Sequence, residues 1–241
     1  MNDLLSDIQA VIFDLDGLLI DSEPVWTESD KAFRKKYKLQ IPMPEATAKK
    51  IHGTGVRDQI RLMQENEGLK GDVDSLAEEY RGEFYKHFLP SPRFALLEGA
   101  ERLLDVLGEQ DMPLAIATGG HTRENVIKIL KKFALQDRFD LIVSSDEVKI
   151  GKPSPEVYVY TAKKLHIDPR YCVALEDSAN GVLSAKAAGM KAIGINSDYE
   201  FQKRLEKADA DIVAPSLEAI IPLFQKGCCN GQGECACAAQ S

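Results

Sequence analysis

The chain has 241 residues, of which 44% are hydrophobic and 28% are charged, and its formal net charge is −8. This composition is that of a globular protein, long enough for one core of ordinary size and a smaller companion domain. The acidic balance argues against a nucleic-acid or anionic-membrane partner, because both favour clustered lysine and arginine. No apolar stretch approaches the roughly 20 residues that span a bilayer, and the first residues lack the basic character of a signal peptide. We therefore expect a cytoplasmic protein that acts on a small molecule, with a monomer as the simplest state.

The apolar run at residues 11–20 carries the most informative side chains. Its first part has strand character and ends in Asp14, Leu15, Asp16 and Gly17. In an open parallel sheet, ligands bind just beyond the carboxyl ends of the strands, which is where these two acids fall. Buried carboxylates at such a place are costly unless a cation or a reacting phosphate uses them. The first strand therefore predicts a functional site.

Residues 21–92 interrupt the pattern of strands and hold no convincing strand of their own. Trp26, Phe33 and Tyr37 recur at helical spacing, and prolines and glycines divide the stretch into segments. We expect a helical cap domain here, inserted after the first strand. It would stand above Asp14 and Asp16, where a lid can exclude water and select a substrate.

From residue 93 onward, short apolar runs alternate with helical patterns. Strands are expected near residues 113–117, 139–143, 171–175, 191–195 and 211–213, with helices between several of them. Such alternation implies right-handed crossovers and a parallel sheet covered on both faces. The predicted fold is α/β, with a Rossmann-like, three-layer core built from residues 1–20 and 93–225.

The cysteines fall into two groups. Cys172 lies in an apolar run and is expected to be a small buried side chain. The other four crowd residues 226–241, after the last periodic segment, where we expect a disordered, reducible tail. Their spacing is not a common zinc pattern, although a soft metal remains an alternative. These four are Cys228, Cys229, Cys235 and Cys237.

Polar residues follow four of the predicted strands, so the sheet should bring them to one edge. Carboxylates offer the hard oxygen ligands that Mg²⁺ prefers, and a hydroxyl with a lysine can hold phosphate oxygens. Together they make a complete set for phosphoryl transfer to a carboxylate. The residues are Asp14 and Asp16, then Thr118 with Gly119, then Lys152, then Glu176 with Asp177.

The segments FDLDG, ATG, GKP and LEDS, in this order, resemble those of the haloacid dehalogenase superfamily, a group of Mg²⁺-dependent phosphohydrolases. The resemblance covers about residues 9–224, and the early helical cap is similar to that of the β-phosphoglucomutase-like branch. It implies that Asp14 is the nucleophile and Asp16 the general acid and base. It further implies phosphate binding by Thr118, Gly119 and Lys152, and metal binding by Asp14, Asp16, Glu176 and Asp177.

The reaction class is narrowed by two positions. Family members that cleave carbon–halogen bonds generally lack an acid at the position of Asp16, so the resemblance implies phosphate-ester chemistry. The mutases of this branch carry a histidine twelve residues after the nucleophile, where this chain has Trp26. A phosphatase of small phosphomonoesters, sugar or nucleoside phosphates, is therefore favoured. A sugar phosphate isomerase of the β-phosphoglucomutase type remains the alternative.

Substrate specificity is expected to come from the cap. Trp26 is a candidate for the pocket wall, although it could equally belong to the core of the cap. Gly53 permits close approach of the backbone, and Arg57 resembles the cap arginine that contacts the distal part of the substrate in this branch. A plain surface ion pair is the alternative for Arg57. His121 follows the turn after Thr118, where it could approach the phosphate edge, but we expect it to be exposed at a helix start.

Overall fold

The computed structural model describes residues 5–88 and 94–225 of the chain. In this part, six parallel strands form the central sheet. The first strand of the chain lies in the middle of this sheet, with a neighbour on each side. The strand order is β5-β4-β1-β6-β7-β8. The strands are β1 (Ala10–Phe13), β4 (Leu114–Thr118), β5 (Leu141–Ser144), β6 (Cys172–Glu176), β7 (Lys191–Ile195) and β8 (Ile212–Ala214).

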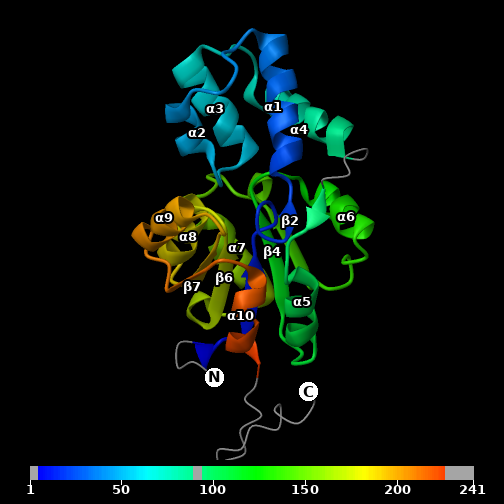
Figure 1. Ribbon diagram of the computed structural model, residues 1–241, viewed down its shortest axis with the longest axis vertical. Helices are drawn as coiled ribbons and strands as arrows, with labels where there is room; N and C mark the ends of the chain where they lie inside the picture. Colours follow the sequence, from blue (N-terminus) through cyan, green and yellow to red (C-terminus); the bar gives the residue numbers. More distant parts are fainter. Residues whose placement is uncertain (1–4, 89–93, 226–241) are drawn as a thin grey trace, which may run out of the picture.

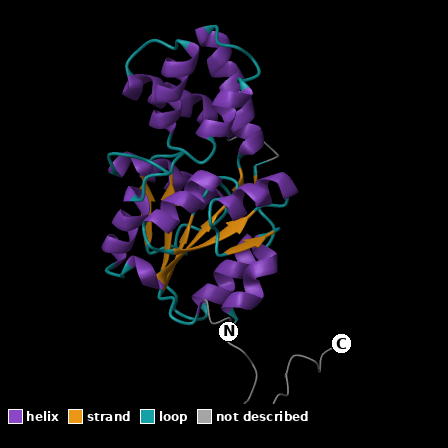
Figure 2. Ribbon diagram, turned by 90° about the vertical axis from the view of Figure 1, so that its left-hand side faces the viewer, coloured by secondary structure: helices purple, strands orange, loops and turns teal. Residues whose placement is uncertain are grey.

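Helices cover both faces of this sheet, which confirms the predicted three-layer α/β core (Figure 2). Successive side chains of a strand point to opposite faces, so Val11 and Phe13 of β1 join one hydrophobic cluster and Ile12 joins the other. The first face packs against α5 (Ala100–Gly108), α6 (Arg123–Lys132) and α10 (Leu217–Phe224). The second packs against α7 (Glu156–Leu165), α8 (Ala179–Ala187) and α9 (Tyr199–Lys207).

Four helices form a separate layer beyond the carboxyl ends of the strands (Figure 1). This layer, the cap, consists of α1 (Glu23–Tyr37), α2 (Glu45–Ile51), α3 (Val56–Glu67) and α4 (Val73–Phe88). It has its own hydrophobic cluster, which includes Phe33, Ile60 and Tyr80. Arg34, fully buried, pairs with Glu67 at 2.6 Å and with Asp30 at 2.8 Å, so its charge is compensated inside the cap.

The two connections between cap and core run side by side. β2 (Ile20–Asp21) leads into the cap, and β3 (Ala95–Leu96) follows the cap. The two strands pair in antiparallel fashion. Sequence patterns did not reveal this two-stranded ribbon, because two residues are too short for a periodicity. The expected boundary at residues 20 and 21 falls inside β2, and the one at residues 92 and 93 lies outside the described residues.

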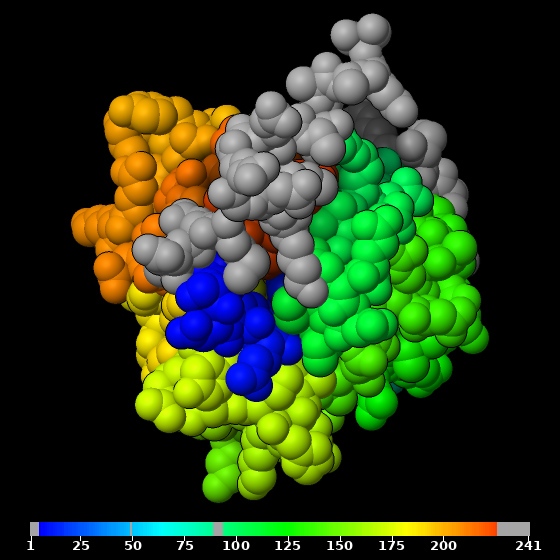
Figure 3. All heavy atoms as spheres, turned by 90° about the horizontal axis from the view of Figure 1, so that it is seen from below, coloured from blue at the N-terminus to red at the C-terminus, as the bar shows by residue number. Residues whose placement is uncertain are grey.

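Other predictions of local structure compare well with the fold. Cys172 is fully buried in β6, as expected. Ser178 caps α8 by accepting a hydrogen bond from the Gly181 amide. The helices α9 and α10 were not predicted. The four cysteines of residues 226–241 lie outside the described part of the chain. The N-terminal segment, in blue, lies at the end of the molecule opposite the cap (Figures 1 and 3). Within the described residues, every helix is too short or too polar to cross a bilayer.

Candidate active site

The turn after β1 places the first two acids. The amide of Asp14 donates to the Leu175 carbonyl at 3.0 Å, which extends the pairing of β1 with β6 by one residue. Gly17 then adopts a φ of 76°, and a Cβ there would lie 2.3 Å from Oδ2 of Asp177. Only glycine meets both conditions, so Gly17 lets the chain turn directly against the acid that follows β6.

Three buried carboxylates meet at this edge of the sheet. Asp14 comes from β1, and Glu176 and Asp177 come from the end of β6, the neighbouring strand. One oxygen from each lies within 4.8 Å of the others. Such a set of hard oxygen donors, crowded and buried, fits a divalent cation such as Mg²⁺.

Lys152 lies behind this cluster and compensates part of its charge. Its ammonium group donates to Oδ1 of Asp14 and to Oε1 of Glu176, both at 2.6 Å, and to the Ala117 carbonyl at 2.9 Å. The Tyr158 hydroxyl donates to the same Oε1 at 2.6 Å, and Ser178 donates to Oε2 at 3.2 Å. Because both oxygens of Glu176 already accept hydrogen bonds, this side chain holds Lys152 in place.

The electrostatics follow from this crowding. Burial raises the pKa of Asp14 to about 7, and the charges of Glu176 and Asp16 add to the effect while Lys152 opposes it. Burial, together with Asp14 and Glu176, raises the pKa of Asp177 well above its usual range. The pKa of Lys152 is raised as well, because the two carboxylates outweigh its own burial. These carboxylates repel one another when they are ionised, and a bound cation would reduce that repulsion.

Asp16 has a different environment from Asp14. Its Oδ1 accepts hydrogen bonds from the indole N–H of Trp26 at 3.0 Å and from Nε2 of His121 at 3.1 Å. Burial acts to raise the pKa of Asp16, but His121 and the hydrogen bonds outweigh it and lower that pKa. The expectation of an exposed His121 is wrong, since the side chain is fully buried. It turns inward because the loop after β4 is covered by the cap.

Thr118 ends β4 on the other side of β1 and is fully buried. Its hydroxyl accepts a hydrogen bond from the Gly120 amide at 3.3 Å. The carbonyl of Gly119 accepts from the Val56 amide of the cap at 3.2 Å. This loop is therefore fixed at one end by the sheet and at the other by the cap, directly beside Asp16.

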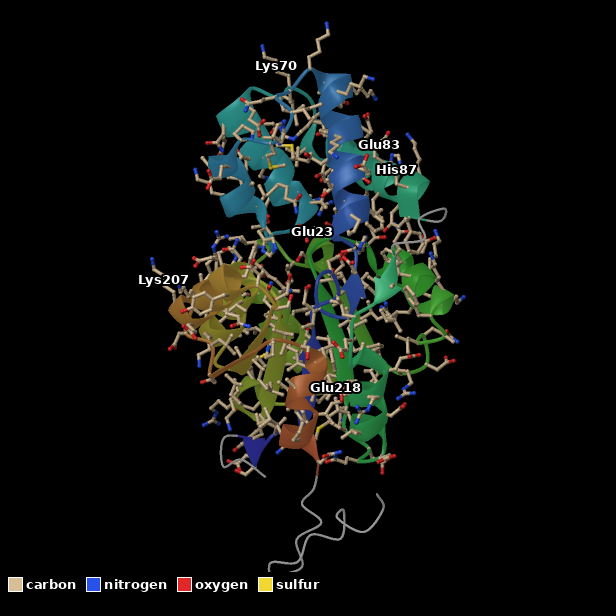
Figure 4. The ribbon with its side chains drawn as sticks, in the orientation of Figure 1. Glu23, Lys70, Glu83, His87, Lys207 and Glu218 are labelled. Atoms are coloured by element: carbon tan, nitrogen blue, oxygen red, sulfur yellow. The ribbon has the colours of Figure 1, made fainter. Side chains whose placement is uncertain are left out.

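A cavity of about 440 Å³ lies between cap and core, above Asp14. Figure 4 labels Glu23, one of its lining residues, at the junction of the two parts. Trp26 and Gly53, the substrate-binding candidates, also line it. The rest of the wall is mixed in character, with acids, hydroxyls and apolar side chains. It includes Asp14, Asp16, Thr27, Asp30, Met43, Ile51, His52, Gln59, Tyr80, Gly119 and Asp177.

The structure does not bring Arg57 to this cavity. Its guanidinium pairs with Asp74 at 2.7 Å and lies 3.6 Å from Asp146, and it lines a second, smaller pocket of about 190 Å³. The ion-pair alternative therefore describes the observed contacts of Arg57. The two acids that it contacts lie in α4 and in the turn after β5. Both are distant from residue 57 in sequence, so the local sequence pattern could not predict these ion pairs.

Several contacts seat the cap on the core. Asn180 donates to the His52 carbonyl at 2.8 Å, at the end of α2. Gly53 packs so closely that a Cβ there would lie 2.1 Å from Oγ of Ser178. On the far side, Arg81 of α4 donates to Asp146 at 2.9 Å and to the Gly120 carbonyl at 3.2 Å. Contacts on two sides thus hold the cap against the core, and the cavity lies between the two parts.

The sequence matches the family model of haloacid dehalogenase-like hydrolases over residues 11–195, well over half of the chain. The chain belongs to this family. The match runs from β1 through β7 and so includes the cap and all the residues of the acidic cluster.

Relatives of this hydrolase are similar over most of their length. A phosphorylated carbohydrates phosphatase of Thermotoga maritima is 31% identical over 204 residues, which are 84% of this chain and 92% of that protein. Hexitol phosphatase B of Escherichia coli is 33% identical over 199 residues, covering 77% and 82% of the two chains. The solved structure of CbbY from Rhodobacter sphaeroides with xylulose-(1,5)-bisphosphate has 25% identity and a TM-score of 0.75, covering 88% and 96%.

Sequence reasoning missed Tyr158 as a contributor to the site of this haloacid dehalogenase-like hydrolase, and it favoured the wrong environment for His121. Tyr158 binds Glu176 from the first turn of α7, where its aromatic ring reads as an ordinary core residue. His121 binds Asp16 from the loop after β4. The signal for His121 was its place three residues after Thr118, on a loop already assigned to the site.

Proposed function

We propose that the chain is a phosphatase that hydrolyses small phosphomonoesters through an aspartyl phosphate on Asp14. The observation that carries the proposal is the meeting of three buried carboxylates with Lys152 at the carboxyl edge of the sheet, beside a cavity between cap and core. Membership of the haloacid dehalogenase-like hydrolases supports it. A cytoplasmic location and a monomeric state are part of the same proposal.

Mg²⁺ is the cofactor that these residues fit best. Asp14 and Asp177 would hold it, with the backbone carbonyl near Asp16 and with Glu176 close by. When bound, the ion would reduce the repulsion between the attacking carboxylate and the phosphate group. The raised pKa of Asp177, caused by burial and by neighbouring carboxylates, supports a cation at this place.

The side chains of the chain itself supply the remaining chemistry. Asp14 attacks phosphorus while the bond from phosphorus to the ester oxygen breaks, and Asp16 gives its proton to the leaving alkoxide. Asp16 then takes a proton from the water that attacks phosphorus, and the bond to Asp14 breaks to release phosphate. Thr118, the amides of its loop and Lys152 stabilise the charge on the transferring oxygens.

The cavity indicates the size and nature of the substrate. About 440 Å³ accommodates a molecule of the size of a sugar or nucleoside phosphate, and its walls carry hydroxyl, carboxylate and aromatic groups. The names of the relatives, a phosphorylated carbohydrates phosphatase and hexitol phosphatase B, favour a phosphorylated sugar or sugar alcohol. Trp26 and Gly53 would contact the part of the substrate beyond the phosphate. Arg57 would take this role only after leaving its ion pairs.

A panel of phosphomonoesters, assayed for released phosphate with Mg²⁺ and with EDTA, tests the proposal. We expect turnover that requires the divalent ion and that disappears in Asp14→Asn. Full hydrolysis after exhaustive removal of divalent ions would contradict it. The alternative isomerase is separated with a hexose 1-phosphate, since an isomerase yields the 6-phosphate with little free phosphate.

A further inference from the structure

Asp16 is held by two ring N–H groups that approach the same oxygen. Trp26 donates from α1 of the cap at 3.0 Å, and His121 donates from the core at 3.1 Å. An ionised carboxylate has only acceptors, so both nitrogens face it with hydrogen. A further hydrogen bond, from Ser22, also holds this side chain. With Oδ1 fixed in this way, the carboxyl group cannot rotate freely, and we assign the proton transfers to Oδ2.

The His121 ring is itself immobilised. It stacks on Trp26 with centroids 5.3 Å apart and packs edge-on against Phe84 at 4.7 Å. Its second nitrogen, Nδ1, lies 2.8 Å from the Tyr85 hydroxyl, which also receives a hydrogen bond from Asn125. Each ring nitrogen therefore has one partner, and the orientation of the ring is determined.

Gly120 packs closely against Asp16 on one side. A Cβ at Gly120 would lie 2.7 Å from Oδ2 of Asp16 and 3.2 Å from the Trp26 ring. The glycine is thus required for the carboxylate and the indole to approach each other. Trp26 and Tyr85 belong to the cap while His121 and Gly120 belong to the core, so the arrangement is complete only when the cap is seated.

We propose that His121 is a positioning residue of this hydrolase, which orients Asp16 for proton transfer and ties that orientation to the seating of the cap through Tyr85 and Trp26. The inference rests on the proposed function, because it assigns to Asp16 the two proton transfers described above. His121 does not contact the reacting atoms and acts only through Asp16.

Single-turnover chemical quench with two esters tests this role. p-Nitrophenyl phosphate has a leaving group that needs little protonation, whereas a sugar-alcohol phosphate has an alkoxide that needs it fully. In His121→Phe, which keeps the ring contacts, we expect rapid release of one equivalent of nitrophenolate, followed by slow hydrolysis of the phosphoenzyme. On the alkyl ester both steps should slow, with kcat lower by about 10–100-fold and KM within about twofold.

Matched variants separate positioning from a general structural effect. His121→Gln can place an amide N–H near the position of Nε2 and should recover part of kcat. His87→Phe, on α4 away from the cavity (Figure 4), should behave like the wild type. If His121→Phe is expressed in unfolded form, His121→Gln and Tyr85→Phe give the same comparison of the two esters.

Three results would overturn the inference. His121→Phe could keep wild-type kcat on both esters, or it could lose nitrophenolate release and alkyl-ester turnover to the same degree, or His121→Gln could show no recovery. Failure of the proposed function looks different, because then the wild type itself would form no phosphoenzyme that depends on Asp14.

Discussion

Lys152 gives the sharpest prediction, because it is the only cation found within hydrogen-bonding distance of Asp14 and Glu176 in the described residues. Its side chain is 1% exposed and touches both carboxylates at 2.6 Å. Lys152→Met keeps much of the volume but removes the charge. Breaking a buried pair from one side costs about 3–5 kcal/mol, since the partner charge remains buried.

The expected loss translates into a readily measured shift. For a chain of this length, 1 kcal/mol corresponds to about 2–4 °C in Tm, so Lys152→Met should melt about 6–20 °C lower. Thermal and urea unfolding of EDTA-treated protein, followed by circular dichroism, would measure it. Lys128→Met is the matched control, because that side chain is 60% exposed and its ammonium group contacts Glu124 and Asn125 at the surface. Its effect should stay below about 1 kcal/mol.

A second substitution checks the physical cause. Glu176→Gln added to Lys152→Met removes one of the unpaired buried charges, so the double variant should regain about 1–3 kcal/mol relative to Lys152→Met. A loss below about 1 kcal/mol in Lys152→Met, or no recovery in the double variant, would refute the view that this ammonium neutralises the cluster.

Three further predictions concern the same edge of the sheet. Asp14→Asn should abolish phosphate release in steady-state assays while its unfolding curve stays cooperative, because the amide is nearly isosteric but a poor nucleophile. Gly120→Ala should lower kcat by about 10–100-fold, since Asp16 must shift away from the new methyl group. Gly82→Ala, in open space within α4, should keep full activity and gain about 0.5–1 kcal/mol; equal activities of the two alanine variants would contradict the reasoning. Finally, the raised pKa of Asp14, about 7 against 3.8 in an unfolded chain, means that the metal-free fold holds a proton that the unfolded chain releases. The stability contributed by this group is complete below pH 4 and is lost as pH rises to 7, so urea titrations should show a smaller decline over that range for Asp14→Asn.

The sequence predicted the strands and the polar residues that follow them, but it did not predict where the strands end. The apolar runs at residues 113–117 and 171–175 stop one residue short of Thr118 and Glu176, which complete β4 and β6. A polar residue at the end of a strand reads as loop when only hydrophobicity is considered. In this fold it is polar because the carboxyl edge of the sheet is where the site lies.

The contacts between cap and core were the part that sequence could not supply. Asp14, Lys152 and Glu176 meet because parallel strands bring their ends together, which the alternation of strands and helices predicts. The bonds from Trp26 and His121 to Asp16 depend instead on how four inserted helices are seated. Arg57 shows the same limit, since its partner Asp146 lies 89 positions further along the chain.

The ribbon of β2 and β3 holds the two ends of the cap segment together. Ile20 pairs with Leu96 and Asp21 with Ala95, so the inserted segment begins and ends at neighbouring points. No strand of the six-stranded sheet comes from that segment, since β1 precedes it and β4 to β8 follow it in the chain. A chimaera that carries a different insert between residues 21 and 95 therefore keeps the acidic cluster of the core. Selectivity can be exchanged as a module where the new insert restores the contacts that Trp26 and Tyr85 make with Asp16 and His121.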